Sequence, residues 1–197
     1  MSEARTASVS RKTAETDITV TINLDGCGKA DVSTGIGFFD HMLCSLTKHG
    51  LFDLTVKACG DLNVDTHHTA EDTGIVLGQA IKEALGDKAG IKRSGYFIMP
   101  MDDALALAAV DLSGRPFLVM DADFSVEKIG DLETEVIREF FYAVAVNAEM
   151  NIHLWRMAGE NNHHIAEALF KAFGKALDMA VQNDPRISGV LSTKGSL

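Results

Sequence analysis

The sequence predicts an α+β fold made of two similar halves, each with the order strand, helix, strand, helix. A pentapeptide, His-His-x-Ala-Glu, occurs at 67–71 and again at 163–167, about half the chain later. Around both copies, short stretches with apolar residues at every second position alternate with longer stretches of helical period. We therefore expect two halves related by pseudo-twofold symmetry, with the helices packed on one side of each small sheet.

The repeat is expected to lie within one domain. The length of 197 residues suffices for a single domain with an ample core. We interpret residues 1–197 as that domain. The two halves extend over approximately 11–90 and 91–184, and residues 185–197 form a C-terminal tail.

The first half opens with an alternating strand, in which Ile18, Val20, Ile22 and Leu24 occupy every second position. A helical stripe, another alternating strand and a polar loop follow, and the loop leads into the helix of the first pentapeptide. The expected elements are a strand at 18–24, a helix at 37–49, a strand at 51–58 and a helix at 67–85.

The second half repeats this order with a longer opening. Two strands joined by a Ser-Gly-Arg turn precede an acidic loop, a helix, a short strand and the helix of the second pentapeptide. The expected elements are strands at 104–111 and 116–123, a loop at 126–131, a helix at 132–151, a strand at 152–157 and a closing helix at 159–181.

Composition and charge exclude several classes of protein. The net charge of −10 argues against general binding to nucleic acid or to an anionic membrane, although a few Arg and Lys gathered locally still suit a small anionic substrate. Residues 1–17 lack the apolar core of a signal peptide, and the longest apolar stretch, 104–110, is too short to span a bilayer. Three cysteines without C-x-x-C spacing indicate reduced thiols in a cytoplasmic protein.

The repeated pentapeptide has the residue types and spacing of a metal site. In each copy the Glu follows the first His by four residues and the second His by three, so a helix places each imidazole near the carboxylate. Imidazole and carboxylate ligands without thiolate suit Mn, Fe, Zn or Co. The alternative is a pair of ordinary surface His residues at each helix start, which the duplication disfavours.

Adjacent side chains on a helix point about 100° apart, so the two imidazoles of one motif suit different ions. Aligning 40–43 with 138–141 places Glu139 where the first half has His41. The pseudo-symmetry then predicts two ion sites, each completed by a His from the other half's motif, with His164 assigned by elimination. The halves meet either within one chain or between neighbouring chains. The predicted ligands are His41, His68, Glu71 and His164 for one ion, and His67, Glu139, His163 and Glu167 for the other.

Basic and polar residues elsewhere suit an anionic substrate group. Lys171 lies one helical turn beyond Glu167, where the first half has Ile75. Arg93 and Arg115 stand near glycines at strand edges, where guanidinium groups can reach phosphate. For each of these residues, an ordinary surface or turn side chain is the alternative. Further candidates are Ser192, Thr193 and Lys194 for phosphate, Glu15, Asp102 and Asp103 for acid–base work, and His49 as a helix cap.

Five segments, taken in order, resemble the imidazoleglycerol-phosphate dehydratase family over about 11–194. They are GIGFFDHML, KHGLFDL, DTHHTAEDTGIVLGQA, DLSGRPFL and NNHHIAEALFKAFGKAL, and the doubled HHxxE with DHM upstream is highly specific. The resemblance implies the enzyme of histidine biosynthesis that dehydrates D-erythro-1-(imidazol-4-yl)glycerol 3-phosphate to 3-(imidazol-4-yl)-2-oxopropyl phosphate. It also implies a homo-oligomeric shell of twenty-four subunits. Its active sites would be completed at subunit interfaces, each with two Mn²⁺ ions, and Fe, Zn and Co remain alternatives.

By position, the resemblance implies the same two ligand sets as the motif spacing. Many relatives have His in place of Glu139, so this chain keeps a ligand there but adds negative charge. Ser45 stands where some relatives have Gln. The implied substrate-binding residues are Glu15, His49, Arg93, Arg115, Lys171, Ser192, Thr193 and Lys194.

The implied chemistry explains why two ions are wanted. Holding both ring nitrogens between two cations favours an imidazolate, which expels the hydroxyl on the adjacent carbon before the C2 proton is lost. Glu15 and Glu71 are predicted to transfer protons, with Glu167 as the alternate. Because ligand His residues must be neutral, activity should fall below about pH 6.5. A dimetal phosphohydrolase and a non-catalytic metal-storage assembly are the alternative functions.

Overall fold

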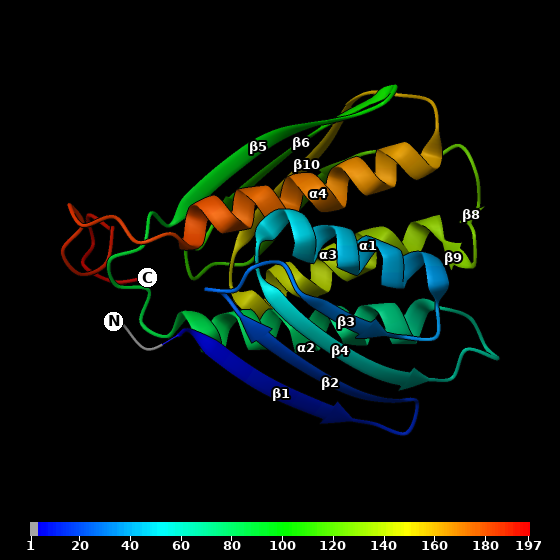
Figure 1. Ribbon diagram of the computed structural model, residues 1–197, viewed down its shortest axis with the longest axis horizontal. Helices are drawn as coiled ribbons and strands as arrows, with labels where there is room; N and C mark the ends of the chain where they lie inside the picture. The colour runs from blue at the N-terminus through cyan, green and yellow to red at the C-terminus, as the bar shows by residue number, and fades with distance from the viewer. Residues whose placement is uncertain (1–3) are drawn as a thin grey trace.

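The computed structural model describes residues 4–197 and contains two sheets of four strands each (Figure 1). The first half consists of β1 (Thr6–Lys12), β2 (Thr16–Asn23), β3 (Ala30–Ser33), α1 (Gly37–Gly50), β4 (Asp53–Gly60) and α2 (His67–Leu85). The second half consists of β5 (Ser94–Met101), β6 (Ala104–Asp111), β7 (Phe117–Asp121), β8 (Lys128–Ile129), β9 (Leu132–Glu133), α3 (Thr134–Ala148), β10 (Asn151–Ala158) and α4 (Asn162–Val181).

The two sheets have the same topology, which confirms the duplication. Their strand orders are β1-β2-β4-β3 and β5-β6-β10-β7. In each, the first three strands are antiparallel neighbours and the last strand, β3 or β7, runs parallel to its partner. Element by element, β5, β6, β7, α3, β10 and α4 therefore repeat β1, β2, β3, α1, β4 and α2.

The four helices lie between the two sheets (Figure 1). α2 packs on β2 of the first sheet, and α4 packs on β5 and β6 of the second, so each sheet is covered by helices on one side, as predicted. The other two helices cross between the halves, because α1 packs against α4 and α3 packs against α2. Each half thus completes the other's helical layer, and neither half has a separate core.

Aromatic side chains fill the centre of this helical layer. Phe140 of α3 stacks on Phe170 of α4 with ring centroids 5.5 Å apart, and Phe39 of α1 meets Phe140 edge to face at 5.2 Å. Burial of such rings is the main source of stability in a core of this kind. The cluster joins three helices from both halves and so packs α4, which carries the second pentapeptide, against α1 and α3.

Several strands have no clear signal in the sequence. β1 and the short β3 expose most of their residues, and β5 is an edge strand that ends in Met-Pro-Met, without a clean alternation. The strands expected at 104–111 and 116–123 exist, but they do not pair with each other, since β10 lies between them. The helix expected at 132–151 spans 134–148, because β9 takes its first residues and Glu149 adopts a left-handed conformation with φ of 53°.

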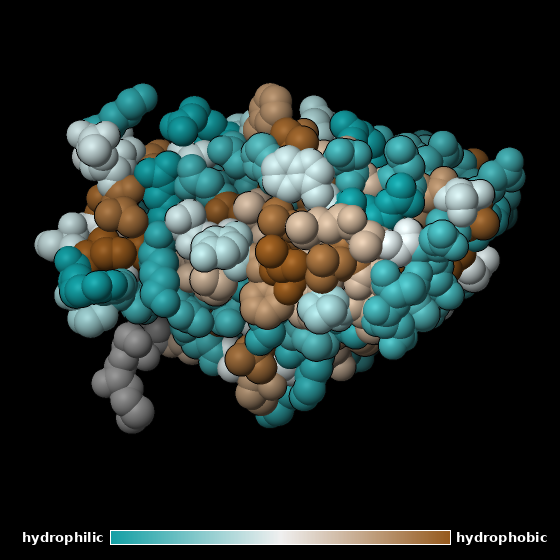
Figure 2. Space-filling view, turned by 90° about the horizontal axis from the view of Figure 1, so that it is seen from above, coloured by the Kyte–Doolittle hydropathy of each residue, from teal (hydrophilic) through white to brown (hydrophobic). Residues whose placement is uncertain are grey.

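The outer faces of the two sheets differ in polarity. On the first sheet, Ser8 pairs with Thr21 and Ser10 with Thr19 through hydroxyl hydrogen bonds. The corresponding face of the second sheet is apolar, and Figure 2 shows a hydrophobic patch over its centre. No helix within residues 4–197 is long and apolar enough to cross a membrane. The exposed large side chains of this apolar face are Tyr96, Ile98, Phe117 and Met157.

Candidate active site

Both pentapeptides begin a helix, and the N-terminal ends of α2 and α4 lie at the same end of the molecule (Figure 1). Side chains just before each helix accept its first free N–H groups. The Oδ1 atom of Asp65 accepts from the amide of His67 at 2.8 Å, and that of Asn161 accepts from the amides of His163 and His164 at 3.0 and 3.3 Å. Asn161 is the N-cap of α4, and Asp65 precedes the N-cap residue of α2, so these hydrogen bonds fix the backbone at the start of each His-His pair.

Glu167 is the centre of a cluster in which α1 and α4 meet. Its Oε2 lies 3.3 Å from Nε2 of His163 and 3.5 Å from Nε2 of His41, while its Oε1 accepts from Nζ of Lys171 at 2.7 Å. Donor atoms about 2.1 Å from a tetrahedral ion stand about 3.4 Å apart. Both imidazoles therefore lie at ligand-like distances from Oε2 of Glu167, although the sequence assigns His41 to a different ion from His163 and Glu167.

The carboxylate of Glu167 is ionised although the residue is buried. Burial by itself would raise the pKa of Glu167, but the hydrogen bond and charge of Lys171, with smaller contributions from His41 and His163, hold the pKa below its usual range. Phe38 packs its edge on the rings of His163 and His41, with centroids 5.1 and 6.4 Å away. The cluster thus offers a charged ligand in a partly apolar setting, where attraction for a cation is strengthened.

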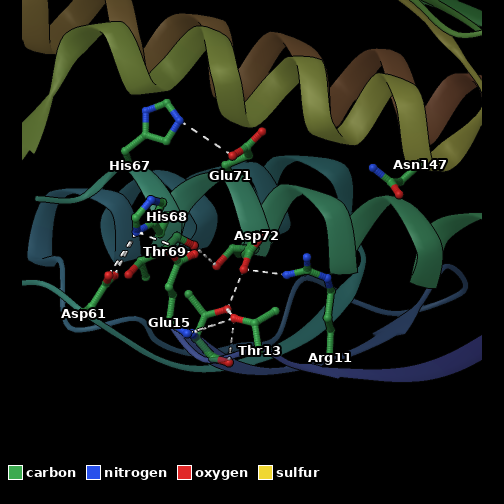
Figure 3. Close-up of polar contacts among 12 residues, drawn as sticks. Arg11, Thr13, Glu15, Asp61, His67, His68, Thr69, Glu71, Asp72 and Asn147 are labelled. Atoms are coloured by element: carbon green, nitrogen blue, oxygen red, sulfur yellow. Dashed lines mark hydrogen bonds and ion pairs between the residues drawn. The ribbon is translucent and has the colours of Figure 1, made fainter.

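The first-half motif is surrounded by other partners (Figure 3). Nδ1 of His68 lies 3.0 Å from Oδ2 of Asp61 and 3.9 Å from Oε2 of Glu15. Nε2 of His67 lies 3.6 Å from Oε2 of Glu71, one turn along α2. These side chains are partly exposed, so this half of the site is open.

A buried network holds Glu15 beside His68. Asp72, the neighbour of Glu71, accepts from the hydroxyl of Thr16 at 2.5 Å and pairs with Arg11 at 2.5 Å (Figure 3). The hydroxyl of Thr13 accepts from the backbone amide of Glu15 at 3.1 Å. The β1–β2 turn is therefore tied to α2, which places the Glu15 carboxylate at the motif.

Asp103, which the sequence offers as a candidate for acid–base work, contacts an imidazole of the second pentapeptide directly. Its Oδ1 lies 2.6 Å from Nδ1 of His164, and its Oδ2 accepts from the amides of Glu160 and Asn161 at 2.7 and 3.0 Å. These two amide hydrogen bonds, then that of His164, lower the pKa of Asp103 well below its usual range. The sequence signal for this contact is a carboxylate in the turn between two strands. Only the pairing of β5 with β6 shows that this turn lies beside the start of α4.

The predicted phosphate-binding residues are divided between two places. Arg93, Ser192 and Thr193 line an open pocket of about 500 Å³ together with Arg186. The guanidinium of Arg93 is already engaged there, by Asp111 at 2.7 and 2.9 Å and by the carbonyl of Leu191 at 2.8 Å. The remaining candidates lie outside this pocket, with Arg115 exposed in the β6–β7 connection, Lys194 exposed in the tail and Lys171 beside Glu167.

His49 of α1 lies near Lys171, because α1 packs against α4. Burial, then the charges of Lys171 and Lys175, lower the pKa of His49. Glu139, by contrast, is half-buried in α3 and lines a separate pocket of about 270 Å³ with Met120, Phe124 and Arg138.

One chain does not bring all predicted site residues together. The amide of Arg93 bonds the carbonyl of Ala180 at the end of α4, whereas His163 lies at its beginning. A helical rise of 1.5 Å per residue separates these positions by about 25 Å. Among residues 4–197, the groups of three metal-ligating side chains are His41, His163 and Glu167, and Glu15, Asp61 and His68, and neither joins the two pentapeptides. The predicted assignment of eight ligands to two ions stays a prediction.

The chain is similar to known proteins over nearly its whole length. The family model described as imidazoleglycerol-phosphate dehydratase matches residues 34–177. The imidazoleglycerol-phosphate dehydratase of Lachnoclostridium phytofermentans is 62% identical over 193 residues, which are 98% of each chain. That of Acetivibrio thermocellus is 63% identical over 189 residues, which are 96% of this chain and 97% of the relative.

Solved structures of proteins with the same name share the fold. The crystal structure from Staphylococcus aureus has a TM-score of 0.82 and 39% sequence identity, covering 91% of this chain and 99% of the other. The structure from Pyrococcus furiosus has a TM-score of 0.83 and 38% identity, covering 96% of this chain and all of the other. At 39% and 38% identity, both solved structures are similar to this chain in sequence as well as in fold.

Proposed function

Because the chain belongs to the imidazoleglycerol-phosphate dehydratase family, and is therefore a hydro-lyase of histidine biosynthesis, we propose that it dehydrates imidazole glycerol phosphate with the substrate ring held between two divalent ions. The contact of His41 with His163 and Glu167 carries the proposal. His41 belongs to one predicted ligand set, and His163 and Glu167 belong to the other. Their proximity is expected if the two ions are neighbours, as binding to both nitrogens of one ring requires.

The donor set fits Mn²⁺, with Fe, Zn and Co as alternatives, since it contains imidazoles and carboxylates and no thiolate. When bound, the ions supply positive charge that stabilises negative charge developing on the substrate ring. In this proposal one ion is held by His41, His68, Glu71 and His164, and the other by His67, Glu139, His163 and Glu167.

Glu15 is the best candidate for proton transfer at the substrate. Its carboxylate is exposed and lies 3.9 Å from His68, and no hydrogen bond within residues 4–197 engages its Oε atoms. Glu167 is less suited, because Lys171 and two imidazoles already surround it. Glu71, if it is a ligand, has its basicity lowered by the ion. Glu15 therefore takes the proton and Glu71 serves mainly as a ligand.

The active site is proposed to be shared between subunits of a homo-oligomer, with the twenty-four-subunit shell of the sequence resemblance as the expected form. Two observations support this. The second pentapeptide and Arg93 lie about 25 Å apart at opposite ends of α4, too far for one small substrate. The outer face of the second sheet also exposes Tyr96, Ile98 and Phe117 together, an apolar surface suited to burial against another copy.

The substrate phosphate is proposed to bind basic and hydroxyl groups from more than one copy: His49, Arg93, Arg115, Lys171, Ser192, Thr193 and Lys194 are the candidates. The enzyme is expected to act in the cytoplasm, which suits its three free cysteines.

The test is to incubate the manganese-loaded, assembled protein with imidazole glycerol phosphate and to follow ketone and free phosphate together. The proposal expects ketone with the phosphate ester intact. Phosphate release without ketone would identify a phosphohydrolase instead. Binding of the metal with neither product would favour a metal-storage assembly.

A further inference from the structure

The two His residues of each pentapeptide differ in what holds them. The second His of each pair, His68 or His164, has a carboxylate within 3.0 Å of Nδ1. The first, His67 or His163, has a carboxylate only near Nε2, from the Glu of its own motif, at 3.6 or 3.3 Å. The same asymmetry occurs in both halves, although different loops supply the carboxylate.

In the second half, hydrogen bonds other than that of His164 hold the Asp103 carboxylate in place. Oδ2 accepts from two backbone amides of the β10–α4 loop, which leaves Oδ1 directed at the imidazole, 2.6 Å away. An ionised carboxylate can only accept hydrogen bonds, so the hydrogen lies on Nδ1 of His164. The ring's lone pair is then on Nε2, which has the exposed carboxylate of Asp102 3.5 Å away and is the atom that would bind an ion.

In the first half, the corresponding contact to His68 comes from Asp61 of the β4–α2 loop. Its two carboxylate oxygens lie 3.0 and 3.3 Å from Nδ1 of His68. The topological counterpart of Asp103 is in fact Glu15, because the β1–β2 turn corresponds to the β5–β6 turn. Glu15 stays 3.9 Å from His68. Asp61, rather than Glu15, therefore orients the imidazole of His68, and the carboxylate of Glu15 remains free for substrate.

We propose that Asp61 and Asp103 are positioning residues that fix His68 and His164 as Nε2 ligands, and that the ion bound by these two His residues is consequently held more tightly than the other. The inference rests on the proposed function for the assignment of ligands to ions. Both oriented imidazoles belong to the set with His41 and Glu71.

The physical reason is pre-organisation. A carboxylate on the far nitrogen fixes the tautomer and the ring orientation and makes the ligating nitrogen more basic, and removing such a partner typically costs about 10- to 100-fold in metal affinity. The ion assigned to His67 and His163 has no such partner among residues 4–197. The two sites should therefore fill in sequence rather than together.

The first experiment titrates the metal-free protein with MnCl₂ and counts free Mn²⁺ by its electron paramagnetic resonance signal. Wild type should show a tight and a weak class of site. Asp61→Asn and Asp103→Asn should each weaken the tight class about 10- to 100-fold, because the amide either presents a donor to Nδ1 or loses part of its acceptor role. Glu160→Gln is the matched control, since it removes one exposed charge from the same loop and should leave both classes unchanged.

Asp61→Asn is the cleaner variant, because the Asp61 side chain bonds His68 alone among the described residues, whereas Asp103 also holds a loop. The second experiment records ¹⁵N solid-state NMR spectra of the metal-free protein labelled at its seven His residues. Each variant should remove one strongly hydrogen-bonded Nδ1–H signal, a change that a general loss of stability does not produce.

Neither readout requires turnover. A protein that makes no ketone but loses its tight Mn²⁺ class in Asp61→Asn would retain the positioning inference and refute the proposed function. Two equal classes in wild type, or an unchanged tight class in both Asn variants, would overturn the inference while leaving the dehydratase proposal intact.

Discussion

Nε2 of His41 in the first half lies 3.5 Å from the carboxylate of Glu167 in the second. The contact exists because α1 packs against α4 rather than against the helix of its own half. Each pentapeptide therefore has the upstream helix of the other half beside it. This exchange of helices places ligands of two predicted ions next to each other, which an independent folding of the two halves would not do.

The packing of α1 on α4 is expected to depend on Gly174. A Cβ atom there would lie 2.4 Å from the carbonyl oxygen of Leu46, so Gly174→Ala should separate the helices and lower stability by about 1–3 kcal/mol despite its better helix propensity. In the equivalent Gly78→Ala, the added Cβ would lie 2.8 Å from Cβ of Asn147 and 3.0 Å from the carbonyl oxygen of Val144, so this variant is the comparison with a smaller expected loss. Thermal unfolding measures both, and equal effects would contradict the prediction.

Glu15→Gln is expected to lower kcat by about 10²–10⁴, the usual contribution of a general acid or base. Manganese content and melting temperature should stay unchanged, since only backbone atoms of Glu15 are held by Thr13. Asp17→Asn, an exposed neighbour that pairs with Lys12, should retain wild-type kcat. A Glu15 variant with normal kcat would exclude this carboxylate from proton transfer.

Lys171→Gln is expected to raise KM for the phosphorylated substrate about 10- to 100-fold, the worth of a lost hydrogen bond to a charged group. Loss of Lys171 also removes the group that lowers the pKa of Glu167, so the pKa of that carboxyl should rise. Steady-state kinetics of Lys171→Gln and of Lys175→Gln, one turn further along α4, make the comparison. The same KM in both variants would show that Lys171 does not bind the phosphate.

Glu133 should make the stability of the folded protein depend on pH in the acidic range. Burial by itself would raise the pKa of Glu133, but hydrogen bonds from Lys128 and Thr66 lower it to about 2, against an ordinary value of 4.5. Because the folded-state pKa is the lower one, this stabilisation is fully present above about pH 4.5 and is lost as the pH falls toward 2.

Melting temperatures of wild type and Glu133→Gln should consequently differ most at neutral pH and converge near pH 2. Glu127→Gln removes a nearby exposed carboxylate and should leave the melting temperature unchanged across the range. A gap between wild type and Glu133→Gln that is constant with pH would mean that the ion pair with Lys128 is not its cause.

Ile98→Glu is expected to dissociate the oligomer. It places a charge in the apolar face of the second sheet, where burial against another copy would leave that charge unpaired. Thr21→Glu makes the matching change on the polar face of the first sheet and should leave the subunit number unchanged. Analytical ultracentrifugation distinguishes these outcomes, and an intact assembly in Ile98→Glu would remove this face from the interface.

Local pattern was sufficient for much of the fold. Alternation identified β2, β4, β6 and most of β10, and helical period identified all four helices to within a few residues at their ends. It failed for β1 and β3, whose side chains are mostly exposed, and for the edge strand β5. Those strands are specified by pairing with their neighbours, which is not a local property.

The sequence by itself determined the duplication, the two His-His-x-Ala-Glu motifs, the family and the kind of ligand each motif offers, because residue type and helical spacing are local. Tertiary structure decided which ligands meet. It brought His41 to Glu167 by exchanging helices between the halves. It directed Asp61, from the β4–α2 loop, at His68, and Asp103, from the distant β5–β6 turn, at His164. It also left Arg93 and His163 at opposite ends of α4. Contacts of this kind depend on how whole elements pack, which no spacing along the chain encodes.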